Sequence, residues 1–434
     1  MANYELRIET SEMKKALDVL SSVVNKKNSL PIMACACIRY DRSRKLFTMT
    51  AGNTEQWLTL ECWKKDEKAD RGYREWMFLD KDSKEQPLDG FCIMVDAFRE
   101  VFASLPALPA QCYLKIDEQG GSMRVNYSKG ECTMPVNDCG GGVADYPEVP
   151  AVVEKNEKGV YGAVTPVVKF SIETKELLPI ISAARVCSAN DELRPVMNTV
   201  CVDCFHDHAV VVASDGHSLF KKSIDTGMGW LRYGEFPVTD PETGRQGSAK
   251  VLIPKQALTP LAKALDQSES ITLTADTQRI SVQSSDGGIR LTTVCIDGNY
   301  PNYESVIPKD NRHQLLIDRQ ELSATLRRIS LFSAEGSNLA ILRRDDEHVI
   351  LNASDEGYGR NADEHVAIIN SESTSLPEGF QIGFKIATMQ LLLGCIQGDN
   401  VMLELGEPNR AMLVKEDAKV SSVTLLIMPM LVNG

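Results

Sequence analysis

A cluster of cysteine and histidine residues is the most suggestive chemical motif in the sequence. Cys201, Cys204, His206 and His208 lie close together, and these residue types at such spacings can bind zinc. Residues 199–204, however, have the composition of a strand, and a separation of three puts Cys201 and Cys204 on opposite faces of a strand. We therefore expect a strand that leads into a polar turn, and no metal site.

Two further motifs resemble catalytic or phosphate-binding sites. Asp215, His217 and Ser218 suggest a hydrolase, but Ser218 would point away from its neighbour His217 along a strand, and the sequence has no Gly-x-Ser-x-Gly elbow here. The glycine-rich residues 138–142 lack the Gly-Lys-Ser/Thr of a phosphate loop. We interpret them as a turn, and the charged residues 343–348 as a hairpin tip. The chain is not predicted to be an enzyme, and no cofactor is expected.

Length, composition and charge limit the class of protein. A chain of 434 residues suits two to four domains, and 43% hydrophobic with 25% charged residues is typical of a soluble globular protein. The N-terminus lacks the basic and apolar regions of a signal peptide, and no apolar run is long enough to span a membrane. The 12 cysteines are interpreted as small buried residues of a reduced protein. We expect a cytoplasmic protein without membrane contact. The net charge of −13 argues against a broad basic surface, although it permits a local basic lining.

The same strand-then-helix opening occurs three times in the sequence. Residues 8–13, 172–177 and 317–322 each follow alternating apolar residues and precede apolar residues at helical spacing. A second strand and helix follow in each third, beginning at Phe91, Val251 and Phe380. This pattern predicts six helices, at residues 12–24, 96–104, 175–186, 255–266, 319–331 and 386–396.

Polar linkers divide the three repeats. Residues 149–166 and 300–314 carry the proline, glycine and charged residues typical of domain junctions. We predict an α+β fold with three similar domains at 1–150, 166–308 and 312–434, each with two helices packed on antiparallel sheets. Pro179 and Pro260 fall inside predicted helices, where they should kink or shorten them. The charged residues 64–90 read as an extended hairpin or surface loop.

Four segments of the chain resemble those of one family. Residues 213–219 (ASDGHSL) resemble its ATDGHRL segment, and residues 300–308 (YPNYESVIP) its FPDYxxVxP segment. Residues 30–32 (LPI) and 427–430 (IMPM) are similar to its LPIL and VMPM segments. These motifs cover the chain in order. The sequence therefore resembles the beta subunit of bacterial DNA polymerase III, the sliding clamp.

The resemblance implies a homodimeric, six-domain ring of clamp-type domains around duplex DNA, bound without sequence preference. The implied partners are the catalytic subunit of DNA polymerase III, the clamp loader, and other polymerases and repair proteins that carry clamp-binding peptides. The family's peptide-binding cleft, between the second and third domains, corresponds here to Met197, Ser214, Gly216, His217, Leu219, Pro301, Val306, Leu426, Met428, Pro429 and Met430. Flexible methionines around a fixed proline suit an adaptable apolar groove. The family usually has arginine at Ser218 and ends in Arg-Leu where this chain has residues 431–434, so the polar rim differs.

The resemblance also implies DNA-facing and subunit-contacting residues. The DNA-facing candidates are Lys14, Lys15, Lys27, Arg185, Arg194, Lys263, Arg327 and Arg328. The predicted helices together are less acidic than the rest of the chain, as a weakly basic lining requires, although solvated helix faces would carry the same charges. The residues that correspond to the dimer interface are Cys132, Met134, Leu331 and Phe332.

Two other classes of function remain open at this point. One is a cytosolic enzyme whose site uses the cluster near Cys201, which would bind zinc stoichiometrically. The other is a repeat-built scaffold unrelated to DNA, whose dimers would not remain on circular DNA.

Overall fold

A computed structural model describes most of the chain. It covers residues 2–24, 30–41, 43–44, 46–62, 89–106, 109–117, 120–138, 141–150, 152, 168–205, 208–225, 249–265, 268–276, 278–345, 348–369, 376–377, 379–417 and 423–432. Lys27, His206 and nearly all of the predicted loop at 64–90 lie outside the described residues.

The order of helices and strands repeats three times, which confirms the predicted α+β fold of three similar domains. Each repeat runs strand, helix, short 3-10 turn, four strands, helix, three strands. The first repeat comprises β1 (Ala2–Glu9), α1 (Thr10–Leu20), η1 (Pro31–Ala34), β2 (Cys35–Asp41), β3 (Leu46–Gly52), β4 (Gln56–Cys62), β5 (Gly90–Met94), α2 (Val95–Ser104), β6 (Pro109–Asp117), β7 (Gly120–Tyr127) and β8 (Gly130–Val136).

The second and third repeats follow the same order. The second comprises β9 (Val168–Glu173), α3 (Thr174–Cys187), η2 (Pro195–Asn198), β10 (Thr199–Cys204), β11 (His208–Ser214), β12 (Ser218–Asp225), β13 (Ala249–Pro254), α4 (Lys255–Leu265), β14 (Ser270–Ala275), β15 (Arg279–Ser284) and β16 (Ile289–Val294). The third comprises β17 (His313–Asp318), α5 (Arg319–Ile329), η4 (Ser330–Phe332), β18 (Leu339–Asp345), β19 (His348–Asp355), β20 (Arg360–Ala367), β21 (Gln381–Lys385), α6 (Ile386–Leu393), β22 (Asn400–Leu405), β23 (Met412–Glu416) and β24 (Val423–Ile427). An extra 3-10 turn, η3 (Tyr303–Val306), lies between them.

Strand pairing follows one rule in all three repeats. The eight strands of a repeat form two antiparallel groups of four, ordered first-sixth-seventh-eighth and fifth-second-third-fourth. The fourth strand of one repeat then pairs with the eighth strand of the next, as β4 with β16 and β12 with β24. These two joints create the two eight-stranded sheets. They leave β8 and β20 as edge strands of the two four-stranded sheets.

The chain forms two compact units. The first consists mainly of Met1–Lys175 and Gln256–Cys295, and the second mainly of Glu176–Leu231, Phe236–Lys255 and Ile296–Gly434. Each unit holds one eight-stranded and one four-stranded sheet. The second repeat contributes strands to both units, because its two strand groups join different neighbours. The predicted domain boundaries at 150–166 and 308–312 therefore stay a prediction.

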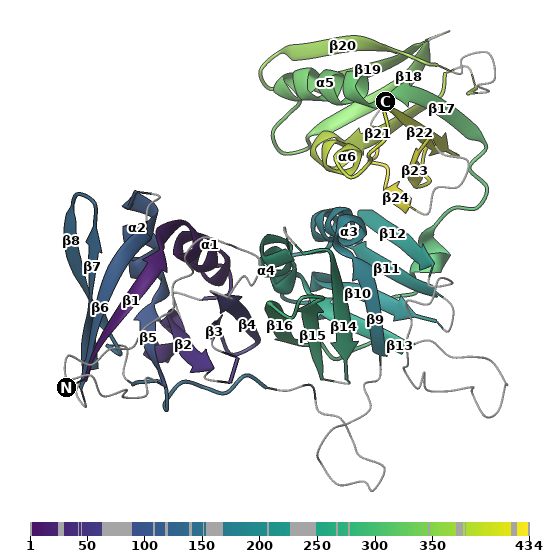
Figure 1. Ribbon diagram of the computed structural model, residues 1–434. Helices are drawn as coiled ribbons and strands as arrows, with labels where there is room; N and C mark the ends of the chain where they lie inside the picture. The colour runs from purple at the N-terminus through teal and green to yellow at the C-terminus, as the bar shows by residue number, and fades with distance from the viewer. Residues whose placement is uncertain are drawn as a thin grey trace, which may run out of the picture. The chain divides into compact units, whose positions relative to one another are not determined.

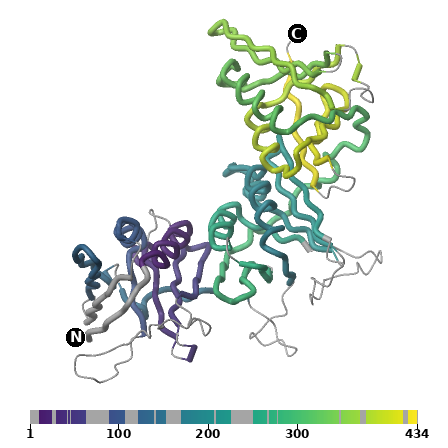
Figure 2. The backbone as a smooth tube through the Cα atoms, turned by 45° about the horizontal axis from the view of Figure 1, so that its top comes forward, coloured from purple at the N-terminus to yellow at the C-terminus, as the bar shows by residue number. Residues whose placement is uncertain are grey.

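Amphipathic helices cover the sheets within each unit. In the first unit α1 packs against α2 and against β3 and β4 through Met13, Leu17 and Leu20, which share one helix face and are fully buried (Figure 1). In the second unit α5 packs against α6, β19 and β20. The Asp318 side chain begins α5 by accepting a hydrogen bond of 2.7 Å from the backbone N–H of Glu321. Residues of the third repeat gather as one body in both views (Figure 2).

The predicted helices exist, but several of their ends were misplaced. The first helix begins at Thr10 and ends at Leu20, four residues before its predicted end, and the last one ends at Leu393. Of the two outcomes expected at Pro179 and Pro260, shortening is wrong, because both helices continue beyond these residues, and a kink stays a prediction. A proline removes one helical hydrogen bond, and the burial of Pro260 in the core offsets part of that loss. Among the described residues, no helix is long and apolar enough to cross a membrane.

Candidate functional site

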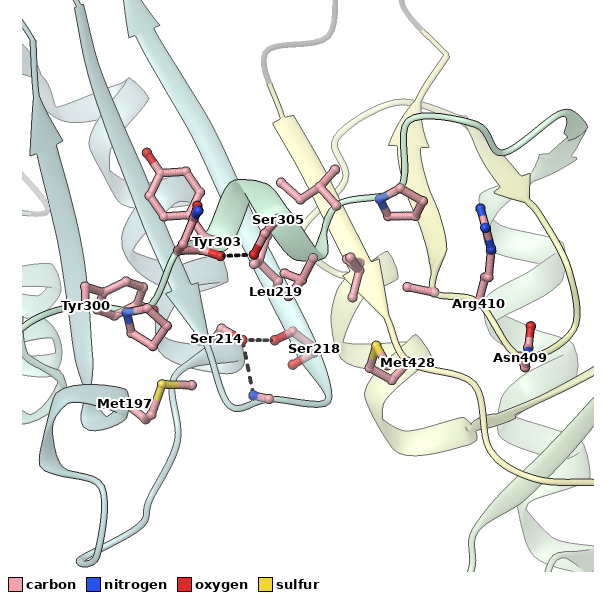
Figure 3. A pocket seen from close by; sticks show the side chains of 18 of the residues that line it. Met197, Ser214, Ser218, Leu219, Tyr300, Tyr303, Ser305, Asn409, Arg410 and Met428 are labelled. Carbon is pink, nitrogen blue, oxygen red and sulfur yellow. Dashed lines mark hydrogen bonds between the residues drawn. The ribbon is translucent and has the colours of Figure 1, made fainter. Parts of the chain in front are cut away.

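A groove in the second unit lies beside the joint between β12 and β24. Its volume is about 530 Å³. In the joint Leu219 pairs with Leu426, and both side chains line the groove; Figure 3 labels Leu219. Other walls come from η2, from residues 300–310 including η3, and from the turn between β22 and β23. The lining residues are Met197, Ser214, Gly216, Ser218, Leu219, Tyr300, Pro301, Asn302, Tyr303, Ser305, Val306, Ile307, Pro308, Asp310, Asn409, Arg410, Ala411, Leu426 and Met428.

The groove has an apolar floor with exposed apolar side chains at its mouth. Leu219, Leu426 and Tyr300 belong to one buried hydrophobic cluster, so the floor is fixed by the core of the unit. By contrast, Val306 is 53% exposed and Met428 is 40% exposed. Large apolar side chains held open to water in a concave site favour an apolar ligand.

The turn from Ser214 to Ser218 forms one rim of the groove. The Asp215 carboxylate accepts hydrogen bonds from the backbone N–H groups of His217 (2.8 Å) and Ser218 (2.6 Å), and from the Ser218 hydroxyl (3.1 Å). The Ser214 hydroxyl donates to the carbonyl of Ser218 at 2.8 Å (Figure 3). Gly216 has a φ of 89°, which glycine adopts readily. The residues that suggested a hydrolase thus build a turn.

A buried carboxylate anchors the opposite wall. The Tyr303 hydroxyl donates to Asp203 Oδ2 at 3.0 Å, and Lys250 Nζ lies 3.8 Å from the same oxygen. Burial and the nearby Asp203 charge raise the pKa of Tyr303 well above its usual range. Lys250 and Lys221 each lie 5.8 Å from the centre of the Tyr303 ring, and Lys221 also pairs with Glu304. This network holds η3 against the sheet.

The two cysteines of the motif at residues 201–208 are fully buried, and Cys201 lies in the core beneath the groove. Cys201 belongs to the hydrophobic cluster that holds Tyr300, and burial raises the pKa of both Cys201 and Cys204 to about 12. The imidazole of His208 stacks on Phe205, with 4.5 Å between the ring centres. Cys201 and Cys204 stand three residues apart on β10, so their side chains point to opposite faces of the strand. Within the described ranges, which omit His206, no group of three metal-binding side chains occurs.

Most of the predicted cleft residues come together in the groove. Those that line it are Met197, Ser214, Gly216, Leu219, Pro301, Val306, Leu426 and Met428. His217, Pro429 and Met430 do not line it. His217 accepts a hydrogen bond at its carbonyl from the Met428 N–H (2.8 Å), and Met430 bridges to the backbone of Gly383.

Sequence reasoning missed the polar end of the groove. Asp310 lies in the irregular linker before β17, Asn409 and Arg410 lie in the turn between β22 and β23, and none of the three belongs to a matched motif. Ser218, noted in the sequence as a departure from the family, does line the groove, although its side chain is buried. Tyr300 and Tyr303 stood within a matched motif, so their aromatic side chains were a signal that could have identified them.

The predicted DNA-facing cations differ in their surroundings. Those exposed on helices are Lys14, Lys15, Arg185, Lys263 and Arg327. Arg194 is exposed and pairs with Asp191 at 2.7 Å. Arg328 Nε donates hydrogen bonds of 2.9 and 3.0 Å to the two carboxylate oxygens of Glu364 on β20. This ion pair neutralises the charge of Arg328 within its own repeat. Lys27 lies outside the described residues.

The predicted interface residues lie on or beside two edge strands, β8 and β20. Cys132 and Met134 lie on β8, where Cys132 is half-buried and Met134 is buried. Leu331 and Phe332 are 70% and 38% exposed on η4, which contacts β20. The η4 surface is therefore apolar and open.

Comparisons with known proteins point to one family. Residues 304–431 match the family model of the DNA polymerase III beta subunit, C-terminal domain. The beta sliding clamp of Caulobacter vibrioides is 22% identical over 431 residues, covering 98% of this chain and 99% of that protein. The beta sliding clamp of Pseudomonas putida is 22% identical over 426 residues, covering 98% of each.

Solved structures share the fold. The DNA polymerase sliding clamp of Bacillus subtilis matches with a TM-score of 0.77 at 17% identity, covering 100% of both chains. The sliding clamp of Pseudomonas aeruginosa bound to griselimycin matches with a TM-score of 0.75 at 20% identity, covering 99% of this chain and 100% of that one. These likenesses establish the fold of the protein.

Proposed function

We propose, from the premise that this chain belongs to the bacterial beta sliding clamp family, that two copies encircle duplex DNA and hold partner proteins on it. Beta sliding clamps are non-catalytic processivity factors of DNA polymerase III, and this chain is one of them. The dimeric ring, its contact with DNA and its use of the groove are the proposal. Its site of action would be the cytoplasm, where the chromosome replicates.

Two edge strands, β8 and β20, carry the proposal of a ring. Within the chain, a fourth strand pairs antiparallel with an eighth strand at both joints. The third repeat leaves its fourth strand, β20, at an edge, and the first repeat leaves its eighth strand, β8, at an edge. A second copy supplies the missing partner for each edge, so two equal head-to-tail contacts close six domains into a ring. Leu331 and Phe332 beside β20 would add apolar area to each contact.

Exposed cations on the helices support weak, mobile binding of DNA. Lys14, Lys15, Arg185, Lys263 and Arg327 supply positive charge in a chain whose net charge is −13. Such a lining attracts phosphates without gripping them, because the remaining acidic surface repels a polyanion and salt screens both effects. A ring with this charge pattern would hold DNA by topology and read no bases.

The groove would bind short peptides of the partners. Its apolar floor and its exposed Val306 and Met428 suit apolar side chains of a peptide. The expected partners are the polymerase catalytic subunit, the clamp loader, and other polymerases and repair proteins that carry such peptides. A dimeric ring would present this groove twice and could hold two partners at once.

The decisive experiment compares retention on nicked circular and linearised DNA. The protein is incubated with each DNA, a cognate clamp loader and ATP, and the complexes are separated by gel filtration in moderate salt. A topological ring stays on circles and slides off linear ends. Equal retention on both DNAs would indicate ordinary binding, and loss from both with an active loader would favour a scaffold unrelated to DNA.

Paired variants test the ring contact itself. Leu331→Glu with Phe332→Glu places two charges on η4 and should turn the dimer into monomers, with loss of retention on circles. Leu30→Glu is the matched control, because Leu30 is 50% exposed and lies outside β8, β20 and η4. A dimer that survives both η4 substitutions would contradict the proposed contact.

A further inference from the structure

The groove carries charge at one end only, among the residues that the structure describes. Of its lining side chains, Asp310 and Arg410 are charged, and they form an ion pair with each other. Figure 3 shows Arg410 beside Asn409, across the groove from Met197 and Tyr300. A ligand that fills the groove would therefore meet apolar groups at one end and this ion pair at the other.

Backbone contacts fix the position of the ion pair. The side-chain amide of Asn311 donates to the carbonyls of Glu404 (2.9 Å) and Ala411 (3.1 Å), which ties the linker to the turn before β23. Gly406 permits this approach, because a Cβ there would lie 2.5 Å from Asn311 Oδ1. Asp310 and Arg410 are the chain neighbours of these tied residues. Their backbone is thus held in place before any ligand arrives.

Positive charge is in excess at this end. Hydrogen bonding and the charge of Arg410, with a smaller effect of Arg312, lower the pKa of Asp310, so one carboxylate faces two guanidinium groups. Lys309 adds a third exposed cation, and Glu407 in the turn adds one further carboxylate. Neither Lys309 nor Glu407 lines the groove. These three cations and two carboxylates give the polar end a net positive charge.

Other cations near the groove are engaged by the chain itself. Lys221 pairs with Glu304 and lies over the Tyr303 ring, and Arg194 pairs with Asp191. Arg410 differs from these two cations because it lines the groove. Its ion pair with Asp310 is also open to solvent, since the Arg410 side chain is 49% exposed and that of Asp310 is 57% exposed. An ion pair this exposed contributes little to stability. A carboxylate from a ligand can replace Asp310 at small cost.

We propose that Arg410 recognises a carboxylate of the bound peptide, next to the apolar side chains that fill the rest of the groove. This inference rests on the proposed peptide-binding function and adds to it the chemistry of the partner, an apolar peptide segment that carries an acidic group at one end. Asp310 occupies Arg410 in the free protein and gives way to the ligand. The acidic group is either an Asp or Glu side chain or the carboxylate of a chain terminus.

The test uses fluorescein-labelled synthetic peptides that share one Leu-Phe core. The neutral peptide has Ala and Ser flanks and a C-terminal amide. A second set carries one Asp at successive flank positions, and a third peptide has a free C-terminal carboxylate. Affinities for the full-length protein are measured by fluorescence anisotropy at two salt concentrations. We expect at least one acidic peptide to bind about three- to fivefold tighter than the neutral one, with the difference reduced at high salt.

Charge variants identify the residue responsible. Arg410→Gln should abolish the preference for the acidic peptide, so that acidic and neutral peptides bind the variant with equal affinity. Asp310→Asn should raise the affinity for the acidic peptide further, because it removes the internal competitor. Arg343→Gln is the control, since Arg343 forms a similarly exposed ion pair with Asp363 on another sheet.

The outcomes separate this inference from the proposed function. Equal binding of neutral and acidic peptides by the unmodified protein, or a preference that persists in Arg410→Gln, would overturn the role of Arg410 while leaving the groove as a peptide site. If no peptide bound the unmodified protein, the peptide-binding function would fail and the role of Arg410 with it. Comparison of the Asp peptides with the free-carboxylate peptide shows which source of the acidic group is recognised.

Discussion

A tyrosine-proline dipeptide follows both the first and the second repeat, but the two tyrosines have different surroundings. Tyr146 precedes Pro147 and is buried against η1, where its hydroxyl donates to the carbonyl of Cys35 at 3.2 Å. Tyr300 precedes Pro301 and is buried in the corresponding cluster of the second unit. The strand registers beneath them agree, since Cys37 pairs with Cys92 and Cys201 pairs with Leu252. Each tyrosine thus fixes a linker to the sheet of its own unit.

The surroundings of the two tyrosines differ in what faces solvent. Met33 in η1 and Met197 in η2 are both buried, at 2% and 9% exposure, but Met33 belongs to the Tyr146 cluster whereas Met197 lines the groove. After Tyr300 the chain forms η3, which presents Val306, and β24 brings Met428 to the same place. The repeat therefore supplies a structural anchor twice, and in the second unit the extra turn η3, together with Met428 after β24, adds the exposed apolar side chains of the groove.

The largest expected difference follows from removing each tyrosine. Tyr146→Ala should reduce the free energy of unfolding by about 3 to 5 kcal/mol, the usual cost of deleting a large buried aromatic side chain. It should leave peptide affinity unchanged once the protein is folded. Tyr300→Ala should reduce both stability and peptide affinity. Urea unfolding and fluorescence anisotropy measure the two effects, and a loss of peptide binding in folded Tyr146→Ala would contradict the comparison.

Alkaline pH should distinguish the cysteines at equivalent positions. Burial raises the pKa of Cys201 to about 12, whereas the thiol of Cys92, by hydrogen bonding, lowers the pKa of Cys37. The Cys201 thiol is therefore protonated in the folded chain at pH values where the unfolded chain has lost the proton. Its contribution to stability is complete below the unfolded pKa of about 8.5 and declines above it, by about 2 kcal/mol between pH 8.5 and 10.

Urea unfolding of Cys201→Ala and Cys37→Ala between pH 8 and 10 measures this contribution. The free energy of unfolding should fall less steeply with pH in Cys201→Ala than in the unmodified protein. Cys37→Ala should not make the free energy of unfolding fall less steeply with pH. The lowered pKa of Cys37 in the folded chain stabilises the unmodified protein as pH rises, so its removal has the opposite effect. Equal slopes for both variants would show that the two positions do not differ in this way.

The smallest expected effect concerns the two methionine environments. Met428→Ala should weaken peptide binding by about tenfold, through loss of apolar contact area, and change stability little because Met428 is 40% exposed. Met33→Ala should lower stability and leave peptide affinity as it is. Anisotropy and urea unfolding on both variants provide the measurement. Unchanged affinity in Met428→Ala would remove it from the binding surface.

Parts of this comparison were predictable from the sequence, and parts were not. The repeat and the apolar centre of the groove followed from motifs that contain Leu219, Tyr300 and Met428. Arg410 was missed because a turn residue has no periodicity, and its position depends on strand pairing that is distant in the sequence. Helix ends were misplaced because apolar spacing continues beyond the last hydrogen-bonded turn.

The joint between β12 and β24 also sets an order of events during synthesis. Leu219 and Leu426 are far apart in the sequence and emerge from the ribosome at different times. One edge of β12 therefore stays unpaired until β24 has been synthesised. An unfinished chain therefore has no groove with which to capture a partner. By the same pairing, a cut before β24 that released this strand would leave β12 with an unpaired edge, which favours aggregation, and would remove Leu426 and Met428 from the groove.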